Sequence, residues 1–165
     1  NKKNKILCAK FRQGHFEGVL DVMDRLTKLI NPTKIYMGEK DLQQLYLVKE
    51  YLEKKYKVNV ISCKIIRDIR KFALSSRNFL LKKKELITMG QLAQYLIYLK
   101  KKLKKISNVE EFLNKKKETL NKSFNINIEY LELRNMYNLK KSNKIKNSKL
   151  LIAYYINKVR LIDNF

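Results

Sequence analysis

Apolar residues recur along the first part of the chain with the spacing of helices and strands. Residues 15–30 are predicted to form a helix that ends near Pro32, because proline cannot donate the amide hydrogen bond that would continue it. Its apolar face comprises Val19, Val22, Leu26 and Leu29. A strand, a helix and a second strand are predicted next, at 33–37, 40–54 and 57–62. Strands that alternate with a helix are typical of a parallel sheet.

The pattern changes after Asn78. Two long helical stretches are predicted at about 83–105 and 108–122, and the first has an apolar stripe of Leu92, Leu96, Leu99, Leu103 and Ile106. Three strands are predicted after them, at 126–133, 149–156 and 159–163. These patterns indicate an α/β protein with a partial Rossmann-like domain at 1–80 and a small α+β domain at 81–165.

Composition is that of a folded protein. The chain has 165 residues and 45% of them are hydrophobic, so it can bury a core. No apolar run approaches the length needed to cross a membrane, and we expect no membrane partner. Cys8 and Cys63 fit no metal-binding spacing, so we expect two reduced thiols in a cytoplasmic protein.

The formal net charge of +23 raises the question of nucleic-acid binding. The lysines recur along nearly every segment, however, and they do not gather around aromatic residues. Those at 82–105 flank the apolar stripe, so they are predicted to form the solvated face of that helix. We therefore expect no specific nucleic-acid partner, although non-specific association at low salt needs only charge.

The octapeptide at 38–45, Gly-Glu-Lys-Asp-Leu-Gln-Gln-Leu, carries the clearest chemical signal. It lies between a predicted strand and a predicted helix, which suggests a tight turn at Gly38 at the edge where open α/β sheets bind ligands. Lys40 and Gln44 are four residues apart and would share one helix face near an N-terminus that favours anions. The alternative is a solvated first turn in which Asp41 caps the helix.

Two further motifs accompany the octapeptide. Ala73-Leu74-Ser75-Ser76-Arg77-Asn78 follows the second predicted strand, and its hydroxyls and guanidinium suit a phosphate. The alternative there is a serine cap beside a surface arginine. Upstream lies the stretch Phe11-Arg12-Gln13-Gly14-His15-Phe16-Glu17-Gly18-Val19.

Together these motifs resemble the pantothenate synthetase (pantoate–β-alanine ligase) family. That family shows Arg-Pro-Gly-His-Phe-x-Gly-Val, then Gly-Glu-Lys-Asp-x-Gln-Gln, then a hydrophobic residue followed by Ser-Ser-Arg-Asn. The runs at 128–134, 151–156 and 160–164 also look like the C-terminal strands of the family. The resemblance therefore extends along nearly the whole chain. It implies the C-terminal half of a Rossmann-like nucleotidyltransferase domain followed by a small α+β domain.

The sequence departs from the family at three places. The family has a His-x-Gly-His signature for ATP in an N-terminal half, and this chain has a single histidine, His15. We therefore expect this chain to be the C-terminal part of a longer or split enzyme, inactive alone. Gln13 replaces the usual proline, and Asp68-Ile69-Arg70-Lys71 stands where the family has an acidic residue and a glycine. Without that glycine, a positive φ is costly for the loop at 67–73.

The resemblance implies an ATP-dependent condensation in two steps. Pantoate attacks the α-phosphate of ATP and forms pantoyl adenylate with release of pyrophosphate. The amine of β-alanine then attacks the adenylate and gives pantothenate and AMP. Side chains would mainly position the reactants and neutralise charge. Mg²⁺ is expected with ATP, and the family implies a homodimer for the intact enzyme.

The resemblance also implies roles for individual residues. Lys40 matches the catalytic lysine near the ATP phosphates, and Gln44 matches the glutamine that binds pantoate. Arg12 is a weaker candidate for a carboxylate in the same pocket. The other matches are all on the ATP side. Asp41 and the backbone of Gly38 match groups near the ribose, and Glu39 belongs to the same ATP-binding motif. Ser75, Ser76 and Arg77 match groups near the phosphates, and Ile66 and Leu74 match groups beside the adenosine.

Two other classes of function stay open at this point. One is a different adenylate-forming nucleotidyltransferase, because adenylation sites with other acceptors share this architecture. The other is a basic module that binds nucleic acid or a protein partner, whose affinity would collapse as salt increases.

Overall fold

The computed structural model describes residues 6–165 and contains two compact units, one that ends at Lys64 and one over Ile65–Phe165. The sequence suggested a division near residue 80. Residues 65–80 instead belong to the C-terminal unit. The physical reason is a set of long-range polar contacts, such as the ion pair between Arg67 and Asp163.

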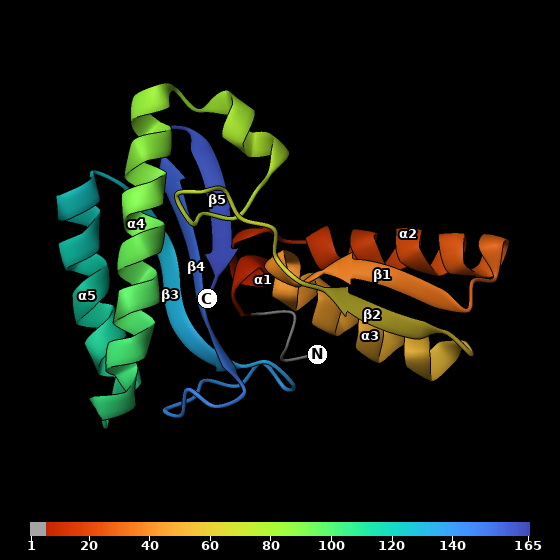
Figure 1. Cartoon of the computed structure of the whole chain (residues 1–165). Helices are drawn as coiled ribbons and strands as arrows, with labels where there is room; N and C mark the ends of the chain where they lie inside the picture. The colour runs from red at the N-terminus through yellow and green to blue at the C-terminus, as the bar shows by residue number, and fades with distance from the viewer. Residues whose placement is uncertain (1–5) are drawn as a thin grey trace. The chain divides into compact units, whose positions relative to one another are not determined.

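The first unit is a strand–helix–strand motif preceded by two helices. Its elements are α1 (Cys8–Phe11), α2 (His15–Ile30), β1 (Lys34–Gly38), the 3-10 helix η2 (Glu39–Asp41), α3 (Leu42–Lys55) and β2 (Asn59–Cys63). The strands β1 and β2 pair in parallel, with Ile35 opposite Val60, and α3 connects them (Figure 1). The predicted α/β pattern is therefore confirmed.

Backbone geometry fixes both ends of α2. Gly14 precedes the helix with a φ of 71°, a conformation that glycine adopts without steric cost. Asn31 follows the helix with a φ of 47°, and its N–H donates to the carbonyl of Thr27. Asparagine tolerates this left-handed conformation better than most residues do. Local sequence thus determines where this helix begins and ends.

The apolar stripe of α2 is not its buried face in this unit. Val22, Leu26 and Leu29 are 55%, 45% and 82% exposed, whereas Phe16 and Thr27 are buried. The periodicity predicted the helix correctly. It could not reveal which side of the helix packs, because packing depends on residues elsewhere in the fold.

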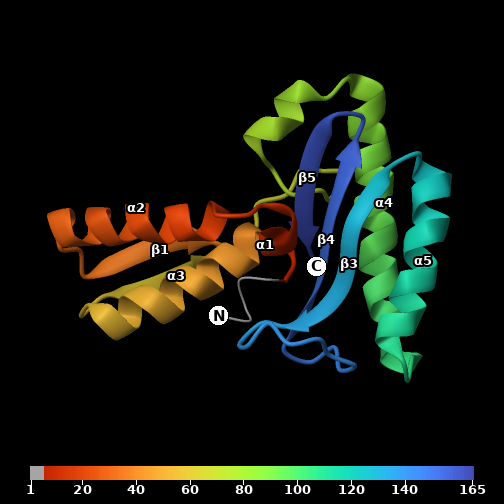
Figure 2. The ribbon, with the colours of Figure 1, turned by 180° about the vertical axis from the view of Figure 1, so that it is seen from behind.

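The second unit is a three-stranded antiparallel sheet with two helices on one face. Its elements are the 3-10 helix η3 (Ser76–Leu80), α4 (Lys83–Lys102), the 3-10 helix η4 (Leu103–Lys105), α5 (Val109–Phe124), β3 (Asn127–Asn135), β4 (Ser148–Ile156) and β5 (Val159–Asn164). The strand order is β3-β4-β5, and Figures 1 and 2 show α4 and α5 side by side against the sheet. The predicted α+β arrangement is confirmed.

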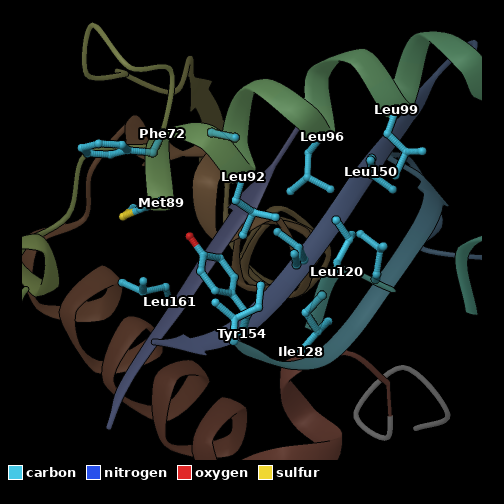
Figure 3. Packing of buried hydrophobic residues seen from close by; sticks show 14 of the residues in the cluster. Phe72, Met89, Leu92, Leu96, Leu99, Leu120, Ile128, Leu150, Tyr154 and Leu161 are labelled. Carbon is cyan, nitrogen blue, oxygen red and sulfur yellow. The ribbon is translucent and has the colours of Figure 1, made fainter. Parts of the chain in front are cut away.

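The core of this second unit forms where the helices meet the sheet (Figure 3). Leu92, Leu96 and Leu99 of α4 are each about 1% exposed and pack with Leu150 of β4 in the same cluster. The apolar stripe predicted for residues 92–106 is therefore buried, apart from the half-buried Ile106. Lys101 and Lys102 lie on the exposed side of the same helix.

Over residues 6–165, no helix combines the length and the apolar character that crossing a membrane requires.

Candidate functional site

The octapeptide lies at a strand–turn–helix junction, as predicted. Gly38 is the last residue of β1, Glu39, Lys40 and Asp41 form η2, and Gln44 lies in the first turn of α3. The turn does not depend on glycine conformation, because Gly38 has an extended backbone with φ −71° and ψ 133°. The 3-10 turn after it changes the chain direction. A Cβ atom at Gly38 would meet no atom within 4 Å, so the space beside this backbone is open.

Lys40 and Gln44 are both partly exposed, but they do not share a regular helix. The α-helix begins at Leu42, and Lys40 lies in the 3-10 turn before it. Asp41 is exposed at the N-cap position of α3 and, among the described residues, its side chain accepts no capping hydrogen bond. The alternative of a capping aspartate is therefore wrong for this structure.

The neighbouring glutamine has a structural contact. Gln43 is buried, and its Nε2 donates a hydrogen bond of 2.9 Å to the carbonyl of Ile6. This bond connects α3 to the chain just before α1, and Gln44 is the more exposed of the two glutamine side chains.

Arg12 follows α1 in the same unit and is half-buried, and its carbonyl accepts a hydrogen bond from the N–H of His15.

The second group of predicted residues lies in the Ile65–Phe165 unit, on a loop closed by backbone hydrogen bonds. Arg67 and Ala73 form an antiparallel bridge, and the N–H of Leu74 donates to the carbonyl of Ile66. Ile66 and Leu74 are therefore neighbours across the loop. They are 74% and 50% exposed, which makes them a small apolar surface open to solvent.

Ser75, Ser76 and Arg77 follow directly at the start of η3. The Oγ of Ser75 accepts a hydrogen bond of 3.3 Å from the N–H of Arg77, so this serine caps the 3-10 helix, as the alternative interpretation predicted. Ser76 is exposed. The Nη1 of Arg77 donates a hydrogen bond of 3.1 Å to the carbonyl of Arg160 on β5, which makes this arginine more than a surface residue. Two hydroxyls and one anchored guanidinium are thus gathered within three residues.

Polar contacts that the sequence did not predict hold this loop. Arg67 donates two parallel hydrogen bonds to Asp163, of 3.0 and 3.1 Å, and a third of 2.6 Å to the carbonyl of Asn164. Asp163 is 4% exposed, and burial raises the pKa of its carboxyl above the usual value. The guanidinium of Arg67 and the N–H of Ala73 act on that pKa in the opposite direction. In the sequence, the run at 160–164 indicates a strand and does not indicate this ion pair.

Lys71 has a positive φ, a backbone conformation that glycine adopts without steric cost. Its φ is 79°, and its N–H donates to the carbonyl of Asp68 in a tight turn. Within residues 6–165, four of the seven non-glycine residues with positive φ are asparagines, which tolerate this conformation, but a lysine there has a steric cost. At Lys71 the loop therefore has a backbone conformation better suited to glycine than to lysine.

Replacing Lys71 by glycine is expected to raise the free energy of unfolding by about 0.5–1 kcal/mol. Relief of the left-handed conformation contributes about 1–2 kcal/mol, and the greater freedom of glycine in the unfolded chain offsets about 0.5–1 kcal/mol of that gain. Urea unfolding followed by circular dichroism measures the difference. Lys146→Gly is the matched control, because Lys146 is exposed and its φ is not positive. Equal loss of stability in both variants would contradict strain at Lys71.

Comparison with known proteins identifies the family. The chain matches the family model described as pantoate-beta-alanine ligase over residues 1–165. A pantothenate synthetase of Clostridium botulinum (strain ATCC 19397 / Type A) is 40% identical over 165 residues, which cover 96% of this chain and 58% of that protein. One from Flavobacterium psychrophilum is 35% identical and is matched over 56% of its length. The chain thus spans less than two thirds of these relatives.

Solved structures agree with the sequence comparisons. A pantothenate synthetase from Thermus thermophilus matches the whole chain with a TM-score of 0.89 and 28% identity, over 60% of that structure. A pantoate-beta-alanine ligase from Francisella tularensis, complexed with beta-gamma ATP and beta-alanine, matches with a TM-score of 0.72 and 31% identity, over 55% of its chain. With a family model matched along its full length and a fold shared with these structures, the chain belongs to the pantoate–β-alanine ligase family.

Proposed function

We propose that this chain supplies the pantoate-binding and phosphate-binding part of an ATP-dependent ligase that joins pantoate to β-alanine. The observation that carries the proposal is that the Gly38–Gln44 and Ser75–Arg77 motifs both occur in one member of this family. Their partly exposed lysine, amide and hydroxyl groups are suited to a polar ligand. The relative solved with beta-gamma ATP and beta-alanine supports the choice of substrates.

The proposed chemistry forms and breaks one bond to phosphorus and one to carbon. A carboxylate oxygen of pantoate attacks the α-phosphorus of ATP, and the bond to pyrophosphate breaks. The β-alanine nitrogen then attacks the acyl carbon of the adenylate, AMP leaves with the electron pair of the broken bond, and the nitrogen loses a proton. Lys40 lies in the 3-10 turn before α3, and its ammonium would neutralise the charge that develops on the phosphates. Ser75, Ser76 and Arg77 would bind phosphate oxygens, and Gln44 would orient pantoate before the reaction.

The nucleotide and its metal ion set further expectations. Exposed Ile66 and Leu74 would contact the adenosine, while Asp41 and the open backbone at Gly38 would lie near the ribose, with Glu39 in the same ATP-binding motif. Arg12 would contribute to carboxylate binding.

Among residues 6–165 no group of three His, Cys, Asp or Glu side chains could hold a metal ion. Mg²⁺ is therefore proposed to arrive with ATP, bound by phosphate oxygens and water. We also propose that the intact enzyme is a cytoplasmic homodimer.

A fusion protein tests the proposal. The N-terminal part of the Clostridium botulinum relative, joined ahead of residue 1 of this chain, should restore release of AMP that depends on ATP, pantoate and β-alanine. We call this fusion the reconstituted enzyme. The 165-residue chain alone should release none, because it has no His-x-Gly-His motif to bind ATP.

Two results would contradict the proposal. One is a reconstituted enzyme that unfolds cooperatively but makes no AMP, while the intact relative is active in the same assay. The other is AMP release that does not depend on pantoate but needs a different acid, which would indicate another adenylate-forming enzyme. Activity of the 165-residue chain alone would show that the His-x-Gly-His portion is not required.

Replacing Gln44 by alanine in the reconstituted enzyme is expected to raise the KM for pantoate roughly tenfold. The amide would bond pantoate equally in the ground state and the transition state, and one such bond is worth about 1–1.5 kcal/mol. Steady-state kinetics at saturating ATP measures the effect, and kcat should change little. Gln94→Ala is the matched control, because Gln94 is an exposed glutamine on α4. An unchanged KM for pantoate would remove Gln44 from the site.

A further inference from the structure

We propose that Arg67 and Asp163 are positioning residues that hold the Ser75–Arg77 segment in its phosphate-binding conformation. The proposal rests on the function assigned above to that segment. It concerns a buried ion pair that joins the loop to the last strand, β5, and that makes no contact with the reacting atoms in the proposed chemistry.

The guanidinium of Arg67 donates hydrogen bonds to three residues, Lys71, Asp163 and Asn164. Its two Nη atoms donate to the two carboxylate oxygens of Asp163, and the same atoms donate to the carbonyls of Lys71 at 2.7 Å and Asn164 at 2.6 Å. Its guanidinium also lies over the ring of Phe165, 4.6 Å from the centroid. A planar guanidinium can satisfy all of these acceptors at once, which a lysine ammonium cannot do.

Asp163 reaches the loop next to the proposed phosphate site. Its Oδ2 accepts a hydrogen bond of 3.0 Å from the N–H of Ala73, two residues before Ser75. Its Oδ1 accepts a hydrogen bond of 2.7 Å from the N–H of Asn164. Each carboxylate oxygen of Asp163 thus accepts two hydrogen bonds. One of these bonds holds the backbone at Ala73, just before the two serines.

A second contact links β5 to the same segment. The carbonyl of Arg160 accepts from Arg77, and the guanidinium of Arg160 donates to both oxygens of Glu129 on β3, at 2.6 to 3.1 Å. The side chains of Arg160 and Glu129 are only 12% and 10% exposed. The strand therefore holds the segment on both sides, at Ala73 and at Arg77.

Apolar packing accounts for only part of the order in this loop. Phe72 and Ala73 are buried, but Ile66, Leu74 and Ser76 are exposed. Lys71 also adopts a costly positive φ, and the bond from Arg67 to its carbonyl helps to hold that turn. A polar clamp is therefore needed to keep one loop conformation, and a displacement of about 1 Å at such a site can cost up to ~10²-fold in rate.

Kinetics of the reconstituted enzyme separates positioning from stability. Asp163→Asn is expected to raise the KM for ATP by about 10- to 100-fold and to leave the KM for pantoate within about twofold. Arg67→Lys, which keeps the charge but loses the fork, should show the same split to a smaller degree. A purely structural role would lower the folded fraction, so kcat would fall and both KM values would stay unchanged. That result would overturn the proposal.

The control is an ion pair of similar burial elsewhere in the same unit. Arg134 pairs with Glu132 on β3 at 2.5 Å, with side-chain exposures of 7% and 25%. Glu132→Gln should lower stability without changing the KM for ATP. If Glu132→Gln changes that KM as much as Asp163→Asn does, the effect is not specific to the loop and the proposal fails.

Hydrogen exchange of the 165-residue chain tests the inference without any activity. In Asp163→Asn the amides of Asp68, Ala73 and Leu74 should exchange at least tenfold faster, while amides of α4 and β4 keep their parent rates. Arg67→Lys provides the same comparison should Asp163→Asn fail to fold. Unchanged exchange at these three amides, or uniformly faster exchange throughout the unit, would overturn the proposal that Arg67 and Asp163 hold the loop. An inactive parent fusion would count against the proposed function alone.

Discussion

Replacing Lys40 by alanine is expected to slow formation of pantoyl adenylate by ~10²–10³-fold in the reconstituted enzyme. As the bond to pyrophosphate breaks, negative charge increases on the departing oxygens, and a fixed ammonium stabilises that charge more than it stabilises bound ATP. Loss of one such donor typically costs about 2.7–4 kcal/mol. Pyrophosphate release in a single turnover measures the rate directly, and the affinity for pantoate should change less.

Lys54→Ala is the matched control for this experiment. Lys54 is an exposed lysine in the last turn of α3, on the same helix that follows Lys40. Its loss removes one charge from a chain of formal net charge +23 and should leave the rate unchanged. If Lys40→Ala forms the adenylate at the parent rate, Lys40 is an ordinary surface residue and the proposed site is misplaced.

Replacing Leu96 by aspartate is expected to unfold most of the Ile65–Phe165 unit. Leu96 is 1% exposed in the cluster between α4 and the sheet. Truncating a buried leucine alone costs about 2–5 kcal/mol, and an unpaired carboxylate at the same place adds to that loss. Because folded domains are stable by only about 5–15 kcal/mol, most of this stability would disappear.

Urea unfolding followed by circular dichroism would register this change. Gln94→Asp is the control, since it places the same residue on an exposed position of α4 two residues earlier. Its expected cost is below about 1 kcal/mol, the range of helix propensity. Equal unfolding midpoints for Leu96→Asp and the parent chain would mean that the α4 stripe does not pack against the sheet.

The candidate site could be predicted in part. The sequence located the octapeptide at a strand–helix junction because β-forming residues precede it and a helical period follows it. It also suggested a tight turn at Gly38, which is wrong, because that residue is extended and η2 makes the turn. The roles of Lys40, Gln44 and the serines stay predictions. In the loop that precedes the serines, tertiary contacts override a local backbone preference. Lys71 adopts a positive φ there, although glycine would adopt it at a lower steric cost.

The sequence by itself determined the longer helices and the strands of this protein and their order, but it did not predict α1 or the 3-10 helices. Helices and strands follow from hydrophobic spacing and from capping residues such as Gly14 and Asn31, which act within a few positions of the chain. Tertiary structure alone decided which faces are buried and which distant residues meet. The stripe of α4 is buried and that of α2 is exposed, although both have the same kind of period. Arg67 meets Asp163 across 96 positions, because folding brings β5 beside the loop, and no local pattern encodes that encounter.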